Sequence, residues 1–413
     1  MKSIKVDVLV IGAGPSGCVS ASLLHQSGIN VLVVEKEKFP RFVIGESLLP
    51  RSMETLERAG FIDALKEKGF QEKFGAKFVR GEEVCDFNFS DQFTEGWNWT
   101  WQVPRADFDL AISQELQKKG VKILFEHTVT GIEFQGSNST TIVLDKDGNS
   151  VEIKAKFIVD SSGYGRVIPR LFNLDKPSSL PMRKTLFSHI TDSNRVAYAE
   201  PNRIIVVVVK QDIWVWLIPF SNGNTSLGFV GDPAYFDQFE GSTQEEKLWK
   251  MINSDTYLTE RFKNQEFVFS PKTIEGWSVT TEKFYDEGFV LTGNVTEFLD
   301  PIFSSGVTLA VVSGERAANV VIKKLKGLPY DWEKDFMEPT LQKVEVFRSY
   351  VMGWYDGTLQ DIFFSPEINP VFKNQICSVL AGYVLDNTNP FVKKHNKLLM
   401  TLSEVIKLQE KQS

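Results

Sequence analysis

The stretch from Val6 to Glu35 constrains the fold more than any other part of this sequence. Residues 6–11 form an apolar, β-branched run of strand length, and residues 29–34 form a second one. Between them, GAGPSG at positions 12–17 fits the pattern Gly-x-Gly-x-x-Gly and leads into helix formers that end before Gly28. This order predicts a dinucleotide-binding βαβ unit: a strand, a glycine turn, a helix and a second strand, with an acid about twenty residues after the turn.

Each residue type in this unit has a physical reason. Gly12 allows a tight turn, Gly14 lets backbone approach a pyrophosphate, and Gly17 lets the helix pack closely on the strand. The helix N-terminus offers free N–H groups and the positive end of its dipole to phosphates. Glu35 is placed to accept hydrogen bonds from ribose hydroxyls. The expected cofactor site of this unit comprises Gly12, Gly14, Pro15, Ser16, Gly17, Glu35 and Lys36.

Composition narrows the class of protein. The chain has 413 residues, 42% hydrophobic and 24% charged, which suits a globular protein of about two or three packed modules. The net charge is −7 and no basic block stands out, so nucleic-acid binding is not expected. Three cysteines lie far apart without metal-ligand spacing, which predicts no metal and a reducing, cytoplasmic setting. The N-terminus runs directly into the first strand, so no signal peptide is expected, and no apolar run is long enough for a membrane span.

Four segments differ in pattern along the chain. Residues 1–170 are typical of the first part of an α/β domain, and their strand-like segment 70–101 is expected on the substrate side. Residues 171–277 change to strands with few helices, which predicts a β-sheet substrate domain. Residues 278–330 return to a strand, a small-residue loop and a long helix, and are expected to close the α/β domain. Residues 331–413 predict a C-terminal helical region.

Two loops before predicted helices supply further candidates. Gly45-Glu46-Ser47 places small groups and a carboxylate near a helix start, although a capped loop would have the same composition. Asp300 to Gly306 follows the strand that ends at Gly293, and it leads into the helix predicted from Val307. The N–H groups of such a loop can bind an anion or the edge of a cofactor.

A lysine pair and three tryptophans lie in the segment 70–101. Residues 70–79 alternate enough to predict one strand, in which Lys73 and Lys77 point to the same face. A lysine pair of this kind usually marks a solvated face. Tryptophans recur with period two, which is typical of a strand whose rings line a pocket or simply pack, at Trp97, Trp99 and Trp101.

Together these features resemble the glutathione-reductase-type FAD-binding fold, and within it the flavin-dependent monooxygenase and halogenase superfamily. Residues 6–35 resemble its ADP-binding part, and VPR at 103–105 with Phe108-Asp109 resembles its arginine segment beside the flavin. Residues 160–163 resemble its Asp-x-x-Gly turn near the adenosine end. The resemblance covers most of residues 1–330 and implies FAD as cofactor, with further contacts from Glu46, Ser47, Arg105, Asp160, Gly293, Asn294, Pro301, Gly306 and Val307.

Three features are similar to flavin-dependent halogenases in particular. WVWLIP at 214–219 matches the family's W-x-W-x-I-P motif in full. Residues 300–306 are similar to the family's flavin-edge and halide loop, which implies halide binding at Ser305 and Gly306. Lys73 stands where the family keeps its catalytic lysine. The resemblance therefore implies catalytic roles for Lys73, Trp214 and Trp216.

Two positions depart from the family pattern. Asn294 stands where many relatives have an Asp that contacts the flavin ribityl chain, although an amide can still form hydrogen bonds there. Phe303 stands where tryptophan halogenases carry a Glu. The apolar residue is more similar to halogenases of phenols or pyrroles, whose substrates are often presented on a carrier protein.

The resemblance implies a route for the reaction. Reduced FAD and O2 would oxidise chloride or bromide to hypohalous acid, which Lys73 would receive by a hydrogen bond or as a haloamine. The halogen would then pass to an electron-rich aromatic ring, while Trp214 and Trp216 separate the flavin from that substrate. No second Gly-x-Gly-x-x-Gly follows a strand, so reduced FAD is expected from a separate flavin reductase.

Three different functions are also compatible with these residues. An FAD-dependent aromatic monooxygenase would share the fold but would have no use for Lys73. An isoprenoid reductase would share the Gly-Glu-Ser and arginine segments and would need a long apolar pocket, which the 32 phenylalanines permit. An inactive flavin-binding protein is the non-enzymatic possibility, and Asn294 is its best support.

Overall fold

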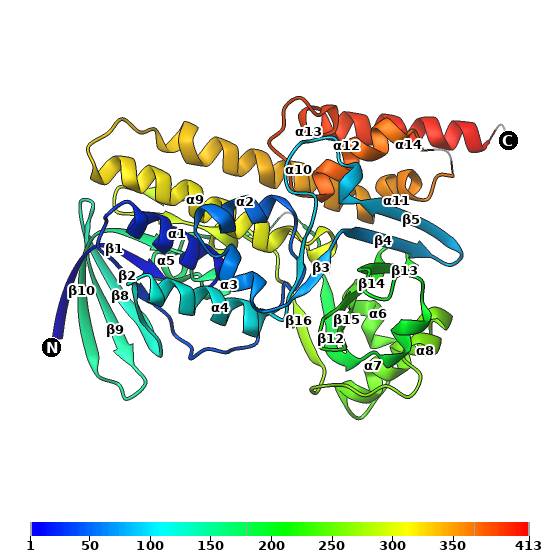
Figure 1. Cartoon of the computed structure of the whole chain (residues 1–413), viewed down its shortest axis with the longest axis horizontal. Helices are drawn as coiled ribbons and strands as arrows, with labels where there is room; N and C mark the ends of the chain where they lie inside the picture. The colour runs from blue at the N-terminus through cyan, green and yellow to red at the C-terminus, as the bar shows by residue number, and fades with distance from the viewer. Residues whose placement is uncertain (1, 179, 367, 412–413) are drawn as a thin grey trace.

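The computed structural model describes residues 2–178, 180–366 and 368–411, and it places two large β-sheets at opposite ends of the molecule (Figure 1). The first sheet has the strand path β18-β19-β10-β1-β2-β7, and β9 and β8 continue from β10 off this path. Its strands are β1 (Lys2–Ile11), β2 (Val31–Val34), β7 (Lys122–Leu124), β8 (His127–Gln135), β9 (Asn138–Asp145), β10 (Ser150–Asp160), β18 (Tyr285–Asp286) and β19 (Phe289–Leu291).

The centre of this sheet is parallel and buried on both faces. Strand β1 pairs in parallel with β10 and β2, and the register sets Ile11 beside Asp160 and Val34. Continuous apolar runs are typical of such doubly covered parallel strands. The helices on the side of the molecule that holds the first sheet are α1 (Pro15–Gln26), α2 (Arg51–Arg58), α3 (Ile62–Lys66), α4 (Arg105–Lys118), α5 (Val167–Leu171) and α9 (Ser305–Leu325).

Glycines let α9 lie directly against α1. A Cβ on Gly314 would lie 2.7 Å from the carbonyl oxygen of Ser16, and the hydroxyl of Ser20 donates to the Gly314 carbonyl at 3.0 Å. The close approach brings the start of α9, residues 305–307, to the carboxyl ends of β1 and β2, where ligands bind in open α/β sheets.

The second sheet has seven strands in the order β16-β12-β15-β14-β13-β4-β5, and residues 75–88 supply its last two. Side chains of β14 alternate between two cores: Trp214 and Trp216 face the C-terminal helices, whereas Val215 and Leu217 face α7 and α8. The strands are β4 (Gly75–Arg80), β5 (Glu83–Asn88), β12 (Lys184–Thr191), β13 (Ile205–Lys210), β14 (Ile213–Pro219), β15 (Asn224–Gly231) and β16 (Lys272–Glu275), and the helices beside them are α6 (Pro233–Asp237), α7 (Gln244–Ile252) and α8 (Thr256–Arg261).

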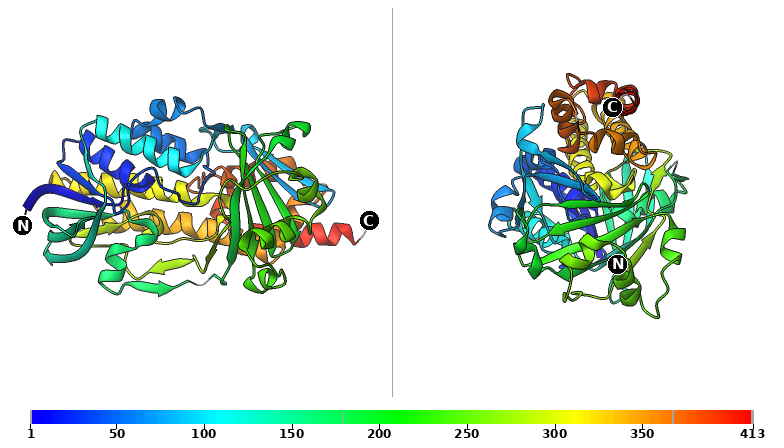
Figure 2. Two further views of the ribbon diagram at one scale, coloured as in Figure 1. Left: turned by 90° about the horizontal axis from the view of Figure 1, so that it is seen from below. Right: turned by 90° about the vertical axis from the view of Figure 1, so that its right-hand side faces the viewer.

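The C-terminal helices lie on one side of the molecule, above the strands of the second sheet in the right-hand view of Figure 2. They share a core with β4, β5, β13 and β14. The helices are α10 (Glu338–Tyr355), α11 (Thr358–Phe363), α12 (Pro370–Leu380), α13 (Pro390–Lys393) and α14 (His395–Glu410). None of the described helices is both long enough and apolar enough to cross a membrane.

Two sequence predictions about residues 70–101 are wrong. Residues 70–79 are not one strand: β3 (Gln71–Lys73) pairs with β6 (Thr100–Gln102), whereas β4 belongs to the second sheet. The chain crosses between sheets at Gly75, where a Cβ would lie 1.9 Å from the carbonyl oxygen of Phe87. Lys73 and Lys77 therefore do not share a face: Lys73 is buried, and Lys77 pairs with Glu200 at the surface.

The tryptophans of this segment pack and line no pocket among those described. Only residues 100–102 form a strand there, so the expected strand does not extend back to Trp97. The ring centroids of Trp97 and Trp99 lie 5.4 Å apart, and those of Trp99 and Trp101 lie 5.3 Å apart, in edge-to-face contacts. A third small sheet pairs β11 (Asp175–Pro177) with β17 (Val279–Thr281).

Candidate active site

The turn between β1 and α1 forms part of the wall of a cavity, hereafter the outer cavity. Gly12 has a φ of +96°, which favours glycine, and a Cβ on Gly17 would lie 1.9 Å from the carbonyl oxygen of Gly12. Helix α1 begins at Pro15 with Gly14 as its N-cap and with no side-chain cap. Its first N–H groups are therefore available to an anion in the outer cavity.

A carboxylate lies beside this turn, at the end of β2. Glu35 is 6% exposed, and it accepts hydrogen bonds from the N–H groups of Ala13 at 2.9 Å and Glu37 at 3.0 Å. Each oxygen is held by one backbone donor, which fixes the carboxylate in the wall of the outer cavity. Because a carboxylate offers about four lone-pair sites, Glu35 retains capacity for ligand hydroxyls.

Two arginines bring positive charge to the outer cavity. The buried carboxylate of Asp109 accepts hydrogen bonds from Arg105 Nε at 2.8 Å and from Arg41 Nη1 at 3.0 Å. Arg105 also donates to the carbonyl oxygen of Ile44 at 3.1 Å. Asp109 thus holds both guanidinium groups in place beside the phosphate-binding turn, where they suit an anionic ligand.

Most residues predicted to hold the cofactor meet at the outer cavity, although they come from five separate segments of the chain. They are Gly12, Gly14, Pro15, Ser16, Glu35, Lys36, Arg105, Gly293, Asn294, Pro301, Gly306 and Val307.

Four other predicted residues lie elsewhere. Gly17 packs against the turn, and Glu46 and Ser47 line the second cavity described below. Asp160 lines neither cavity: its carboxylate accepts hydrogen bonds from the backbone N–H groups two and eight residues on, at 3.0 and 2.8 Å. It therefore shapes the turn that follows β10, and its burial raises the pKa of Asp160.

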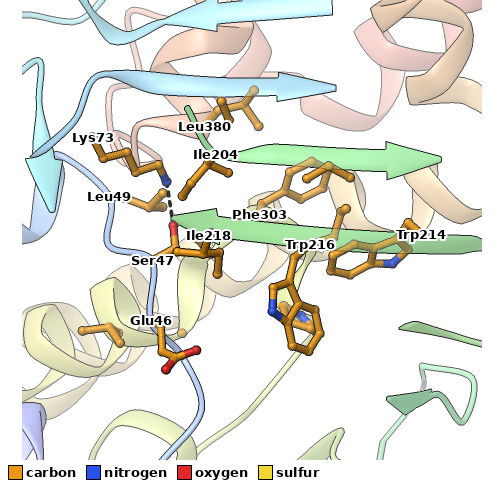
Figure 3. A pocket seen from close by; sticks show the side chains of 18 of the residues that line it. Glu46, Ser47, Leu49, Lys73, Ile204, Trp214, Trp216, Ile218, Phe303 and Leu380 are labelled. Atoms are coloured by element: carbon orange, nitrogen blue, oxygen red, sulfur yellow. Dashed lines mark hydrogen bonds between the residues drawn. The ribbon is translucent and has the colours of Figure 1, made fainter. Parts of the chain in front are cut away.

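A second cavity, hereafter the inner cavity, is drawn in Figure 3. It shares part of its lining with the outer cavity. Apolar side chains form most of its lining, many of them from β4, β5, β13, β14 and the end of α12, and the polar side chains among them are few. A mostly apolar cavity with a few polar groups is typical of a small-molecule site. Six residues line both cavities and form the shared wall: Ile44, Gly45, Phe298, Pro301, Gly306 and Val307.

Lys73 is a buried cation in the inner cavity. Its side chain is directed toward Ser47 in Figure 3, and Nζ donates to Ser47 Oγ at 2.8 Å and to the carbonyl oxygen of Leu48 at 3.0 Å. The residue is 3% exposed, and burial together with the nearby charge of Arg203 lowers the pKa of Lys73 to about 7. An ammonium has three donors, so one remains after these two hydrogen bonds.

The N-terminus of α9 lies at the shared wall. Ser304 adopts a left-handed φ of +55°, and Asp300 caps the preceding turn by accepting from the N–H of Ile302 at 3.1 Å. Of the two residues predicted to bind halide, Gly306 lines both cavities, whereas Ser305 is buried behind the wall and lines neither. The helix start therefore presents its first N–H groups where the two cavities meet.

The two motif tryptophans line the inner cavity alone. Trp214 Nε1 donates to Tyr355 Oη at 3.0 Å, and that hydroxyl donates to Asp300 at 3.0 Å. Trp216 Nε1 donates to the hydroxyl of Ser226 at 3.0 Å. Neither ring reaches the outer cavity, so the shared wall, and not the tryptophans, separates the two cavities.

Long-range partners were missing from the sequence prediction. Glu46, 2% exposed in the inner cavity, lies 2.6 Å from Nε2 of His189, which is 143 residues away in the chain. Arg203, whose charge acts on Lys73, is paired with Asp86. No local motif marks His189 or Arg203, because each acquires its role only when the second sheet assembles.

The outer cavity fits FAD on observations of its own residues. The glycine turn, the uncapped start of α1 and two arginines suit a pyrophosphate, and the carboxylate of Glu35 suits a ribose. The start of α9 suits the polar edge of a flavin ring. The fold and this cavity define a flavoprotein.

Comparison with known proteins agrees with this class. A family model described as "FAD binding domain" matches residues 5–251, and the chain belongs to this family. It is similar to the 1H-pyrrole-2-carbonyl-[peptidyl-carrier protein] chlorinase of Pseudomonas fluorescens, at 27% identity over 92% of this chain and 89% of that protein. It is also similar to the corresponding brominase of Pseudoalteromonas luteoviolacea, at 26% identity over 92% of each chain.

One similar solved structure is that of a protein from Cytophaga hutchinsonii described as a flavoprotein/dehydrogenase. It is 59% identical to this chain, with a TM-score of 0.97 over 98% of this chain and 100% of the other. The chain is an FAD-dependent oxidoreductase with a mixed α/β FAD-binding fold.

Proposed function

We propose that this protein is a flavin-dependent halogenase that acts on an electron-rich aromatic ring, phenol-like or pyrrole-like, free or bound to a carrier protein. The observation that carries the proposal is the position of Lys73. This amine lies in an apolar cavity that shares a wall with the cofactor cavity, and it is 3% exposed. A hydroxylase has no use for an amine placed in this way.

Bound reduced FAD, supplied by a separate flavin reductase, would use O2, a halide and a proton to give hypohalous acid, water and oxidised FAD. The residues of this chain hold the other participants. The halide binds at the N–H groups that begin α9, at the positive end of the helix dipole; of Ser305 and Gly306, Gly306 is the one that lines both cavities. Gly306 lines both cavities, so hypohalous acid formed beside it has a short path from the outer cavity to the inner one.

Lys73 receives the hypohalous acid in the inner cavity. With two hydrogen bonds to Ser47 and Leu48, the ammonium keeps one N–H and the neutral amine keeps its lone pair for a ligand. The pKa of about 7 makes both forms available near neutral pH. Hydrogen bonding in a desolvated cavity polarises the halogen, which the aromatic C–H carbon then attacks, so that the products are aryl halide and water.

The lining of the inner cavity supports a phenol-like or pyrrole-like substrate. Phe303 is 4% exposed and makes edge-to-face contacts with Tyr350 and Trp354, so the wall carries no carboxylate at that point. The names of the chlorinase and brominase relatives specify a pyrrole held on a peptidyl carrier protein. A carrier-bound pyrrole is therefore the first substrate to test.

The apolar lining also suits a second candidate, an FAD-dependent reductase of isoprenoid double bonds. The FAD-binding fold is equally compatible with an aromatic monooxygenase and with an inactive flavin-binding protein. Each of these four functions predicts a different outcome from the same mixture, so a single assay separates them.

The test supplies the purified protein with FAD, a flavin reductase, NADH, O2 and bromide, together with a pyrrole or phenol substrate. Mass spectrometry should find a brominated ring. A hydroxylated ring would show that the protein is a monooxygenase, and reduction of an added isoprenoid would show that it is a reductase. If none of these products formed with any substrate, only flavin binding would remain. Any of these three results would overturn the halogenase proposal.

A further inference from the structure

A third cavity lies behind the start of α9 and shares no lining residue with the outer or inner cavity. Arg51 of α2, Thr308 and Val312 of α9, Lys343 of α10 and the loop 382–386 line it. The volume open to the centre of a water-sized sphere is about 60 Å³. Since one water molecule needs at least about 10–15 Å³ of such volume, the cavity has room for a few waters or one small ion.

Lys343 places a buried amine in this cavity, with no partner among the described residues. It is 4% exposed, and its Nζ has no hydrogen bond or ion pair with any residue in the described ranges. An isolated buried ammonium is costly, and burial lowers the pKa of Lys343 well below its usual value. An occupant that accepts hydrogen bonds would remove that cost.

The other polar groups around the cavity are mainly donors and cations. The buried hydroxyl of Thr308 also lacks a partner among the described residues, and the charges of Arg51 and Arg316 oppose that of Lys343. Three acids are close but already engaged. Glu54 pairs with Arg51 at 3.4 Å. Glu315 accepts from Thr55 at 2.7 Å and pairs with Arg58, and Asp386 accepts from Thr94 at 2.7 Å and from the N–H of Thr388 at 2.9 Å.

We propose that this cavity binds a small inorganic anion of halide size, with Lys343 and the hydroxyl of Thr308 as its ligands. The two donors without partners, the amine of Lys343 and the hydroxyl of Thr308, favour an anion, and the volume excludes a nucleotide or coenzyme. Thr308 lies in the first turn of α9, directly after Val307 of the shared wall. The anion therefore stabilises the helix start that faces the active site.

The first test locates the anion. Crystals of the FAD-bound protein soaked in sodium bromide should show an anomalous peak within hydrogen-bond distance of Lys343 Nζ, and the peak should be missing in Lys343→Met. A cavity that holds only water at the bromide concentration of the soak would overturn the proposal. Because the diffraction map shows position, a bromide at Ser305 and Gly306 is not mistaken for this one.

The second test measures binding in solution. The melting temperature of the wild type should be higher in sodium bromide than in sodium gluconate of equal ionic strength. Lys343→Met should show a smaller difference between the two salts. Lys334→Met, which removes a lysine that is 75% exposed, is the matched control and should keep the full difference. Equal rises in the three proteins would mean that a bromide peak in the crystal reflects binding at soak concentration only, and would contradict the proposal.

Thr308→Val removes only a hydroxyl, so it keeps the test decisive if Lys343→Met fails to fold. Its bromide-dependent rise should be smaller than that of the wild type, and an unchanged rise would count against the site. Neither test depends on halogenation. The anion site can therefore prove absent while the proposed halogenase function holds, and the site can prove present while that function fails.

Discussion

The outer and inner cavities share six residues but are built in different ways. The outer cavity depends on backbone: a glycine at φ +96°, an uncapped helix start and a carboxylate fixed by two N–H groups. The inner cavity depends on side chains from the second sheet, from the loops beside it and from the end of α12, gathered around the buried amine of Lys73 in β3. Backbone geometry fixes the site for the cofactor, and long-range packing fixes the site proposed for the substrate.

The difference has a consequence for mutation. A side chain added at Gly12 or Gly17 meets backbone atoms, which cannot move aside without disrupting the unit. A side chain changed in the inner cavity alters the chemistry or the local packing and leaves the cofactor cavity intact. Four variants or conditions test whether the two cavities separate in this way.

The largest effect is expected for Gly17→Val, beside the turn that forms the wall of the outer cavity. Its Cβ would lie 1.9 Å from the Gly12 carbonyl oxygen, so α1 must move away from β1 and the phosphate-binding turn is lost. The purified variant should carry no flavin absorbance and should melt at a much lower temperature. Gly131→Ala, where the added Cβ meets nothing within 4 Å, is the control and should bind FAD normally. Retention of FAD by Gly17→Val would refute the backbone account of this cavity.

Lys73→Met tests the inner cavity. Loss of one positioned donor in a desolvated site costs about 10²–10³-fold in rate, so halogenation should fall by that factor while FAD binding and oxidation of reduced FAD continue. Lys77→Met is the matched control, since that lysine pairs with Glu200 outside the cavity, and it should keep wild-type activity. Equal halogenation by wild type and Lys73→Met would remove the amine from the mechanism.

The pKa of Lys73 predicts a dependence of stability on pH. The pKa is about 7 in the folded protein and about 10.4 in the unfolded chain, so the unfolded chain binds more protons between these values. The free energy of unfolding should therefore rise with pH in this window, by up to about 1.4 kcal/mol per pH unit, relative to Lys73→Met. Urea titrations of both proteins at several pH values measure the difference. Parallel pH profiles would show that the amine is not desolvated.

Trp216→Phe should have the smallest effect. It leaves the buried hydroxyl of Ser226 without its donor, at a cost of about 1–3 kcal/mol in the free energy of unfolding, and it should leave FAD binding unchanged. Trp277→Phe is the comparison, because Nε1 of Trp277 is buried without a partner among the described residues, so its loss should cost less. If Trp216→Phe abolished FAD binding, the assignment of this ring to the inner cavity alone would be wrong.

The same contrast explains how far the sequence could predict the structure. A glycine turn, a helix start and an acid lie within thirty residues, so residue types alone predict the βαβ unit and most of the outer cavity. Asp160 was assigned to the cofactor because a carboxylate that shapes a turn has the same local sequence as one that binds a ligand. Only the fold separates these two roles.

The inner cavity was predictable only in part. The motif at 214–219 marked β14, and the alternation of its side chains then decided that both tryptophans face the cavity. Lys73 was recognised by resemblance, but its burial was not, because the crossing at Gly75 separates it from Lys77. The influence of Arg203 on its pKa depends on contacts between segments far apart in the chain.

We propose that two adjoining cavities divide the work of this protein, with the flavin in one and Lys73 in the other. A crystal structure of the protein with FAD and bromide tests it most directly. We expect the flavin ring in the outer cavity against Gly306 and Val307, bromide at the start of α9, and an inner cavity left open around Lys73. A flavin ring that fills the inner cavity, or that lies away from the shared wall, would contradict it.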